Sequence, residues 1–293
     1  MSHNQLYLKL KDISHAKFVA SHLAQISLSD EIVIIDTRSP EAFAAGHIPN
    51  AVNIHDIFTF LASSTPEGID ELKSKFADIF GAAGLSGYET AVLYEDSLDT
   101  GFGQSCRGYF LLKYLGYEKI NILQGGYQSW TAEGLTISKE PTVPEPTKFP
   151  LRDTGNEFMV NKEEVLETLD SDIILLDVRD VDEWIAESSS PYGKDFSPRK
   201  GRLPGAVWIE WYRMMKPGAV PMFKSPNEIL SECKTVGINK ETPVYLYCFK
   251  GARASNTLVA LKSAGIQNVK MYFGSWNEWS QYPSLPIEEG LPF

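Results

Sequence analysis

One of the three cysteines stands where a thiol could act as a nucleophile. Cys248 follows the apolar run "PVYLY" and precedes "FKGARAS", in which Ala254 begins a helical pattern. A cysteine at a strand end directly before a helix faces unpaired backbone N–H groups and the positive end of the helix dipole. Gly251 permits the tight loop that turns these groups inward, and Lys250 and Arg253 add positive charge. These features predict a lowered pKa for Cys248 and a cradle for an anionic sulfur species.

The other two cysteines have weaker settings. Cys233 lies in the helical pattern "ILSECKTVGI", where a half-buried inert thiol is expected, and Cys106 lies at a helix start beside Arg107 without a tight glycine loop. A purely structural role for Cys248, as a small buried hydrophobe, is the alternative to the nucleophile. Arg107 has two interpretations, a contact with the active-site cleft or a surface or ion-pair role.

Histidine placement limits how Cys248 can be activated. All five histidines lie within the first 55 residues, so no Cys–His dyad can form within the C-terminal half. Activation must therefore come from the loop and its charges. The scattered cysteines show no CxxC spacing and the histidines no HxxxH spacing, so we expect neither a metal nor a cofactor.

The sequence segments that are expected to position this loop occur twice along the chain. Residues 32–54, "IVIIDTRSPEAFAAGHIPNAVNI", return in altered form at 173–209, and residues 90–130 return at 242–279. Short aliphatic runs alternating with helical patterns are typical of βα units, in which a parallel sheet is covered on both faces. The sequence therefore predicts an α/β fold of two similar domains. Both copies have an Asp-x-Arg at a strand end, including the first copy, which lacks a counterpart of Cys248. We therefore expect Asp36/Arg38 and Asp177/Arg179 to be structural.

Composition sets the boundaries and the class of protein. We expect one domain over 1–137, a proline-rich extended linker over 138–150, and a second domain over 151–293 that carries a basic loop insertion at 188–200. This insertion is either a solvated loop or a cover over an anionic substrate. The net charge of −11 and the pI near 5.0 argue against nucleic-acid and membrane partners. No signal peptide or membrane-spanning run is visible, and free thiols fit a reducing compartment, so we expect a cytoplasmic protein.

Several segments resemble the two-domain rhodanese-like sulfurtransferases, which include thiosulfate and 3-mercaptopyruvate sulfurtransferases. "DTRSPEAFAAGHIPNAVNI" looks like the family's first signature, and "YFGSWNEW" looks like the one near its C-terminus. "CFKGARA" lies where the family has its active-site loop. The likeness covers nearly the whole chain, and it implies two tandem rhodanese-like domains, each a mainly parallel sheet with helices on both faces.

The resemblance implies a mechanism and a set of site residues. Catalytic Cys248 would take a sulfane sulfur from a small-molecule donor as a persulfide and pass it to a thiophilic acceptor, such as cyanide, a thiol, or a thioredoxin-like or carrier protein. The substrate-binding residues would be Phe249, Lys250, Gly251, Ala252 and Arg253. The alignment of "AVLYED" with "PVYLYC" places Asp96 opposite Cys248, which predicts a catalytically silent first domain.

Departures from the family pattern bear on the donor and on rival functions. Lys250 retains one of the cations typical of thiosulfate enzymes. Glu183 stands where mercaptopyruvate enzymes carry an arginine, and Arg253 stands where two-domain members commonly have threonine. We therefore favour thiosulfate over 3-mercaptopyruvate. The alternatives are a cysteine-dependent phosphatase of the same fold, whose loop has Cys-x5-Arg spacing instead of the Cys-x4-Arg found here, and a non-catalytic sulfur-carrier or docking protein.

Overall fold

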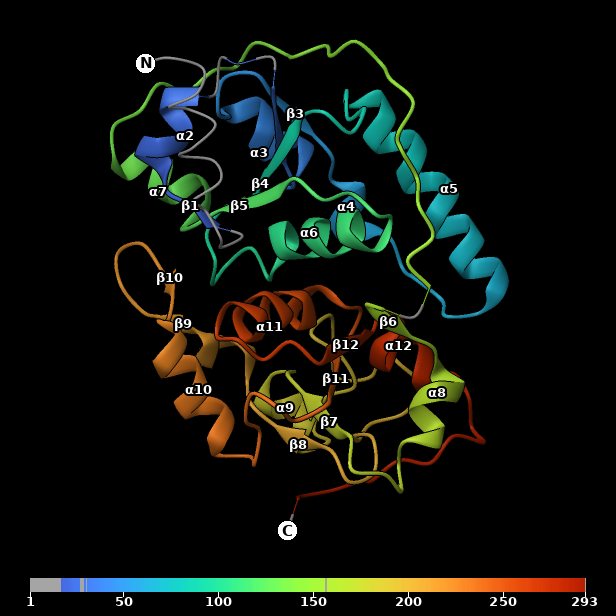
Figure 1. Cartoon of the computed structure of the whole chain (residues 1–293). Helices are drawn as coiled ribbons and strands as arrows, with labels where there is room; N and C mark the ends of the chain where they lie inside the picture. The colour runs from blue at the N-terminus through green and yellow to red at the C-terminus, as the bar shows by residue number, and fades with distance from the viewer. Residues whose placement is uncertain (1–16, 27–28, 30, 156, 293) are drawn as a thin grey trace.

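A computed structural model describes residues 17–26, 29, 31–155 and 157–292 (Figure 1). The N-terminal half contains β1 (Lys17–Phe18), α2 (Ala20–Ile26), β2 (Ile32–Asp36), α3 (Pro40–Ala45), β3 (Ala51–Asn53), α4 (Asp56–Thr59), α5 (Pro66–Ala82), β4 (Thr90–Tyr94), α6 (Gln104–Tyr114), β5 (Ile120–Leu123) and α7 (Gly126–Ala132). The C-terminal half contains β6 (Met159–Val160), α8 (Lys162–Glu167), β7 (Ile174–Asp177), α9 (Val181–Trp184), β8 (Val207–Trp208), the 3-10 helix η1 (Trp211–Met214), β9 (Met215–Lys216), β10 (Met222–Phe223), α10 (Pro226–Lys234), β11 (Val244–Tyr247), α11 (Ala252–Ser263), β12 (Val269–Tyr272) and α12 (Ser275–Trp279).

Each half is built on a five-stranded parallel sheet, and the two sheets have the same topology. The strand order β1-β5-β4-β2-β3 in the first half corresponds to β6-β12-β11-β7-β8 in the second. The only antiparallel strand pair among the described residues is β9 with β10 in the second half. The predicted fold class, a tandem of mainly parallel α/β units, is thus confirmed.

Alternation along the central strands explains why helices cover both faces. Ile34 of β2 joins a core that includes Leu23 of α2 and Trp130 of α7, and its neighbour Ile35 joins the core on the opposite face. A strand buried on both sides must be apolar at successive positions, and this is the continuous aliphatic run seen in the sequence. The fold therefore follows from short local patterns.

The two halves pack through α6 and α11, which lie against each other between the sheets (Figure 1). Phe110 of α6 stacks on Phe273, which follows β12, with ring centroids 5.0 Å apart. One apolar core runs continuously across this boundary. The N-termini of both helices also meet, because a Cβ on Gly103 would lie 2.5 Å from the carbonyl oxygen of Ala252. The end of β11 is therefore brought against the first half.

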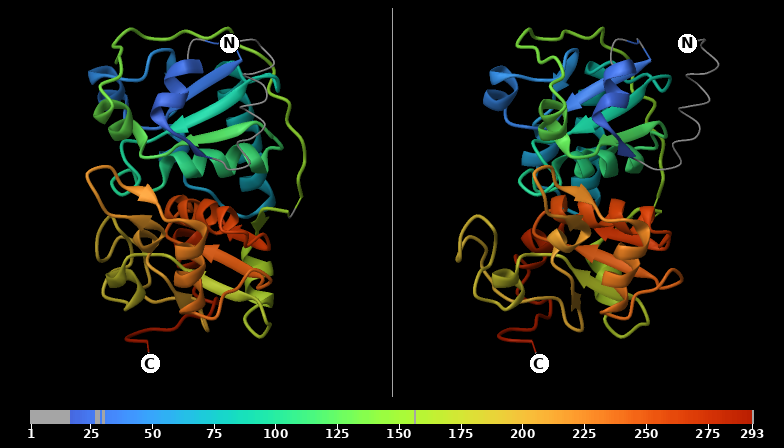
Figure 2. Two further views of the ribbon diagram at one scale, coloured as in Figure 1. Left: turned by 60° about the vertical axis from the view of Figure 1, so that its left-hand side comes forward. Right: turned by 90° about the vertical axis from the view of Figure 1, so that its left-hand side faces the viewer.

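Residues 138–150 contain no helix or regular strand and pass along the outside of the first half (Figures 1 and 2). Phe149 is buried there and stacks on Tyr117, with centroids 5.5 Å apart. A second connection comes from the turn between β9 and β10, where the side-chain amide of Gln128 donates to the carbonyl of Ala219 at 2.7 Å. Within the described residues, every helix is too short or too polar to span a bilayer.

Candidate active site

Cys248 lies at the carboxyl end of β11, in the loop that leads into α11. Its Sγ accepts a hydrogen bond from the backbone N–H of Gly251 at 3.1 Å, and its side chain is buried. We call residues 248–253 the cysteine loop. Gly251 has φ of 87°, and a Cβ there would lie 2.7 Å from the ring of Phe273. Only glycine therefore satisfies both the left-handed backbone and the close ring, as the tight loop predicted from the sequence requires.

Helix α12 binds two carbonyl groups of the cysteine loop. The N–H of Trp276 donates to the carbonyl of Cys248 at 3.0 Å, and the N–H of Asn277 donates to that of Phe249 at 2.8 Å. The backbone N–H of Cys248 donates to the hydroxyl of Ser275 at 3.2 Å. Ser275 itself has a positive φ of 54°, an uncommon conformation for a residue with a side chain. It lies in "YFGSWNEW", but its role was not predicted from the sequence.

A cavity of about 610 Å³ opens on Cys248 and receives residues from both halves. The first half contributes Phe58 of α4 and Phe102 and Gln104 at the start of α6. The second half contributes the cysteine loop, the start of α9 and residues 188–194 of the insertion. Of the predicted substrate-binding residues, Phe249, Lys250, Ala252 and Arg253 line this cavity. The contributions of Phe58 and Phe102 were not predicted, because contacts across the halves leave no local signal.

Lys250 is an unusual cation at the floor of this cavity. Its Nζ lies 3.9 Å from the ring centroid of Phe58 and 5.0 Å from that of Tyr192, and its side chain is largely buried. Burial, with a further contribution from the charges of Arg107 and Arg253, lowers the pKa of Lys250 to about 7, although Cys248 opposes the change. The ammonium has an aromatic cage and no carboxylate in salt-bridge contact among the described residues, so its charge is available to an anion.

Arg253 is held in a different way. Its guanidinium binds both carboxylate oxygens of Glu183, at 2.5 and 3.0 Å, and lies 3.1 Å from a carboxylate oxygen of Asp180. Burial alone would lower the pKa of Arg253, but these carboxylates raise it above its ordinary value. Arg253 therefore lines the cavity as a charge that is already neutralised. The counter-ion of Arg253 is Glu183, the residue that stands where mercaptopyruvate enzymes carry an arginine.

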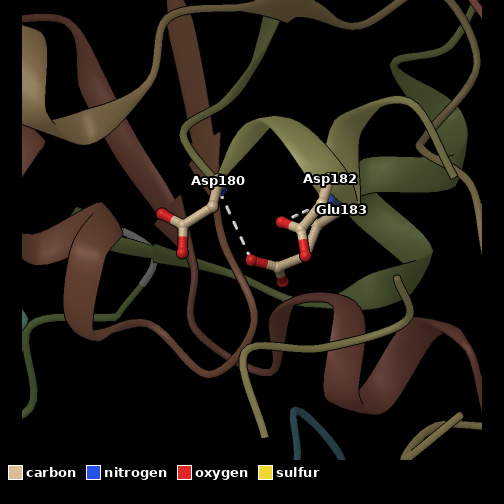
Figure 3. Close-up of side chains that lie close together, drawn as sticks. All are labelled: Asp180, Asp182 and Glu183. Atoms are coloured by element: carbon tan, nitrogen blue, oxygen red, sulfur yellow. Dashed lines mark hydrogen bonds between the residues drawn. The ribbon is translucent and has the colours of Figure 1, made fainter. Parts of the chain in front are cut away.

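Three carboxylates gather at the start of α9, on Asp180, Asp182 and Glu183 (Figure 3). The backbone N–H of Asp180 donates to Glu183, and that of Glu183 donates to Asp182, as expected at a helix N-terminus (Figure 3). Asp180 also accepts from the indole N–H of Trp211 at 3.1 Å. Because Arg253 binds Asp180 and Glu183, the arginine already supplies the positive charge at this group.

The insertion at 188–200 forms one wall of the cavity. The rings of Tyr192 and Phe196 meet Phe249 edge-on, with centroids 5.6 and 5.9 Å away. Arg199 donates to four backbone carbonyls of residues 279–285, and Lys200 pairs with Asp195 at 2.6 Å. Lys194 is exposed at the cavity edge. Of the two interpretations of the insertion, the structure therefore favours a cover over the site, and only one of its three cations faces the cavity.

The first half contains a counterpart of the cysteine loop, but the predicted alignment of Asp96 with Cys248 is wrong by one residue. Asp36 pairs in register with Tyr94, as Asp177 does with Tyr247, so Glu95 corresponds to Cys248. The carbonyl of Glu95 also accepts from the start of α7, as that of Cys248 does from α12. Strand pairing therefore shifts the alignment of "AVLYED" with "PVYLYC" by one residue.

Glu95 caps α6 from within the protein. Its carboxyl group accepts from the backbone N–H of Gln104 at 2.8 Å and from the hydroxyl of Ser105 at 2.9 Å. Burial raises the pKa of Glu95 to about 8, despite these hydrogen bonds. A carboxyl group cannot form a persulfide, so Glu95 at this position agrees with the expectation of a catalytically silent first half.

The remaining candidates fall outside the cavity. Cys106 and Cys233 are buried in the core, and burial raises the pKa of Cys233 to about 11. The two Asp-x-Arg pairs have matching geometry, with 2.6 Å between Asp36 and Arg38 and 2.6 Å between Asp177 and Arg179. Each arginine also binds a backbone carbonyl, of Gly46 or Gly201. This duplication of an internal brace is what a structural role predicts.

Comparisons with known proteins agree with this geometry. The family model of the rhodanese-like domain matches this chain twice, at residues 19–133 and 161–282. A thiosulfate sulfurtransferase from Pseudomonas aeruginosa is 28% identical over 270 residues, which cover 92% of this chain and 95% of that protein. A putative thiosulfate sulfurtransferase from Mycobacterium bovis is 30% identical, covering 89% and 92%. The sulfur carrier protein TtuD from Thermus thermophilus is 28% identical, covering 90% of each.

Among solved structures, the chain is similar to EanB, which has been determined with ergothioneine bound and with a cysteine persulfide. The TM-score is 0.77 at 29% identity, over 90% of this chain and 66% of EanB, so this chain spans just under two thirds of that protein. The matched ranges contain Cys248, Glu95 and four of the five strands of each sheet, and they leave out only the edge strands β1 and β6. The chain therefore belongs to the rhodanese-like family and carries two copies of its domain.

Proposed function

We propose that the protein is a sulfurtransferase that carries sulfur as a persulfide on Cys248. The observation that carries this proposal is the buried Sγ, which accepts a hydrogen bond from the N–H of Gly251 at 3.1 Å in a cavity that Lys250 also lines. Relatives named thiosulfate sulfurtransferases over most of the chain, and a related structure with a cysteine persulfide, support the same chemistry.

The proposed reaction has two steps. The Cys248 thiolate attacks the outer sulfur of thiosulfate, the new S–S bond forms as the S–S bond of thiosulfate breaks, and sulfite leaves with the electron pair. The product is a Cys248 persulfide anion, which the loop N–H groups and Lys250 would stabilise. A nucleophile such as cyanide then attacks the outer sulfur, and the thiolate returns. Electrons and atoms balance in both steps without a cofactor.

We favour thiosulfate over 3-mercaptopyruvate as the donor. Thiosulfate is a compact dianion, and it fits a site in which one buried ammonium group lies beside the thiol. A mercaptopyruvate carboxylate would need its own cation, but Arg253 is occupied by Glu183 and Asp180. A carboxylate placed near Glu183 would be repelled.

The acceptor is a thiophilic small molecule or a protein thiol in this proposal. Phe102 of the first half and Tyr192 of the insertion line the cavity and are 40% and 50% exposed, so we expect a partner to contact them. The relative named a sulfur carrier protein keeps a protein acceptor as the second candidate. Cys106, Cys233 and Cys248 form no disulfide, which fits the reducing cytoplasm that we propose as the protein's location.

A phosphatase is less well supported by the site. Phosphate recognition needs an arginine free to bind phosphate oxygens, whereas both terminal nitrogens of Arg253 bind Glu183. None of the described residues that line the cavity is a histidine, and the carboxylates at its edge bind Arg253 or lie at the start of α9. We therefore retain the sulfurtransferase as the proposal.

Intact mass spectrometry tests the proposal directly. After incubation with thiosulfate, the protein should gain one sulfur atom at Cys248, and cyanide should remove it as thiocyanate. Cys248→Ser should gain no sulfur and should lose turnover, whereas Cys233→Ser should behave as the wild type. A Cys248→Ser protein that still transfers sulfur would refute the assignment, and a gain of sulfur with 3-mercaptopyruvate alone would change the donor.

A further inference from the structure

Arg107, in the half that lacks a counterpart of Cys248, is a buried arginine with no carboxylate in salt-bridge contact in the described part of the chain. It is 0% exposed, and its guanidinium donates to the carbonyls of Ile57, Phe58 and Phe60 at 2.8, 2.9 and 2.7 Å. Its Nε has no hydrogen-bond partner among the described residues. A buried charge normally pairs with a counter-ion, so an unpaired one at this depth calls for a specific role.

The contacts of Arg107 lead to the cysteine loop by two routes. The guanidinium carbon lies 4.7 Å from the ring centroid of Phe273, and that ring leaves room only for glycine at position 251. Gly251 is the residue whose N–H reaches Sγ of Cys248. On the second route, Arg107 binds the carbonyl of Phe58, whose ring lies over the ammonium group of Lys250.

The charge of Arg107 also has few possible counter-ions. Burial lowers its pKa to about 10, and among the described residues Cys248 and Tyr192 are the groups that oppose this change. Burial raises the pKa of Tyr192, so its phenol stays neutral near pH 7. Cys248, as thiolate or persulfide, is therefore the group that can supply the missing negative charge.

We infer that Arg107 is a positioning residue for Cys248, which acts across the boundary between the halves. It holds Phe273 and α4 against the cysteine loop, and its unpaired charge favours the anionic form of the sulfur. The other charged and titratable groups facing Cys248 are Lys250 and Arg253 from the loop, Tyr192 from the insertion, and Asp180 and Glu183 from the start of α9. Because Glu183 and Asp180 neutralise Arg253, Arg107 and Lys250 are the uncompensated cations of this group.

This inference gives the first half a role in the chemistry, although Glu95 stands there in the place of Cys248. It rests on the proposed function in treating Cys248 as the sulfur-carrying residue. A persulfide made more stable as an anion would form faster from an anionic donor. Loss of Arg107 should then raise the pH at which Cys248 becomes reactive, which a purely structural arginine would not do.

The test is the pH dependence of Cys248 alkylation by iodoacetamide, resolved by peptide mass spectrometry. Arg107→Met should move the midpoint upward by about one pH unit, because a nearby cation lowers a thiol pKa by this order. Arg107→Lys, which keeps a cation, should retain more of the wild-type midpoint. The matched control is Arg202→Met, since Arg202 is also buried, binds two carbonyls and packs on Trp184, but pairs with Glu288 away from the cavity.

The outcomes separate clearly. A folded Arg107→Met protein with the wild-type midpoint would overturn the inference, as would an equal shift in Arg202→Met. If Arg107→Met does not fold, Phe273→Leu replaces it, because this change removes the ring between the guanidinium and Gly251. An unchanged alkylation midpoint in Phe273→Leu would then overturn the inference. Alkylation needs no sulfur donor, so failure of the proposed sulfur transfer would appear separately, as wild-type protein that is alkylated but gains no sulfur.

Discussion

Glu183 and Arg253 form a buried two-point ion pair at the edge of the cysteine cavity, with bonds of 2.5 and 3.0 Å. Both residues are almost wholly removed from solvent, at 0% and 3% exposure. The pair neutralises the loop arginine, whereas Lys250 has no carboxylate in salt-bridge contact among the described residues. Because the two cations have different partners, substitutions of each should have different effects.

Removing one partner of this pair should cost more than removing an exposed charge. Glu183→Gln leaves Arg253 with only Asp180, so we expect a loss of about 3 kcal/mol in the free energy of unfolding. Urea denaturation followed by circular dichroism measures it. Asp182→Asn, at an exposed carboxylate of the same turn, is the control and should change stability by less than about 0.5 kcal/mol. Equal stability of the two variants would contradict a structural ion pair.

Lys250 should make donor binding depend on pH near neutrality. Its pKa of about 7 means that the ammonium form is lost as the pH rises above this value. If a thiosulfate dianion binds the charged form, KM for thiosulfate should increase above about pH 7, by up to about tenfold per pH unit, whereas it should level off below.

Lys250→Arg provides the matched comparison, because arginine stays charged throughout this range. Initial rates of thiocyanate formation at constant ionic strength should show a flat KM in the variant. A wild-type KM that is itself flat from about pH 6 to about pH 9 would exclude Lys250 as the donor-binding cation.

Glu95 should make the fold less stable at alkaline pH. Its pKa is raised to about 8 in the folded protein from 4.5 in the unfolded chain, so the folded state holds a proton that the unfolded state has released. Stability from this group is therefore full below about pH 4.5 and falls as the pH rises to about 8.

Glu95→Gln keeps a neutral group of similar shape and removes this titration. We expect the variant to be more stable than the wild type at about pH 8.5, by up to about 4–5 kcal/mol, with sulfur transfer unchanged. Thermal unfolding over a series of pH values measures the difference. A parallel decline of both proteins with pH would show that Glu95 is already ionised when folded.

Gly251 should tolerate no side chain. Gly251→Ala adds left-handed strain, and it places a Cβ against Phe273, so persulfide formation should fall at least about tenfold and stability by about 1–3 kcal/mol. Gly237→Ala separates the two effects, since Gly237 has φ of +81° but no atom within 4 Å of the added Cβ. It should lose stability only. Full sulfur transfer by Gly251→Ala would show that the Gly251 N–H does not hold the sulfur.

The amino-acid sequence by itself determined the duplicated α/β architecture and the position of Cys248 before a helix. Both follow from local rules, because a strand buried on two faces is apolar throughout and a glycine behind a strand end permits a tight turn. The helix start next to the cysteine was visible for the same reason. The charges of Lys250 and Arg253 were also visible in the sequence, but the groups that these two residues contact were not.

Only the tertiary structure decided which charges are free. Glu183 and Arg253 are 70 residues apart in sequence, and they meet because α9 and α11 both begin at the carboxyl edge of one sheet. Phe58 and Arg107 reach the cysteine loop only because the halves pack through α6 and α11. The one-residue error at Asp96 has the same origin, since hydrogen-bond register between strands, and not loop length, determines which residue stands opposite Cys248.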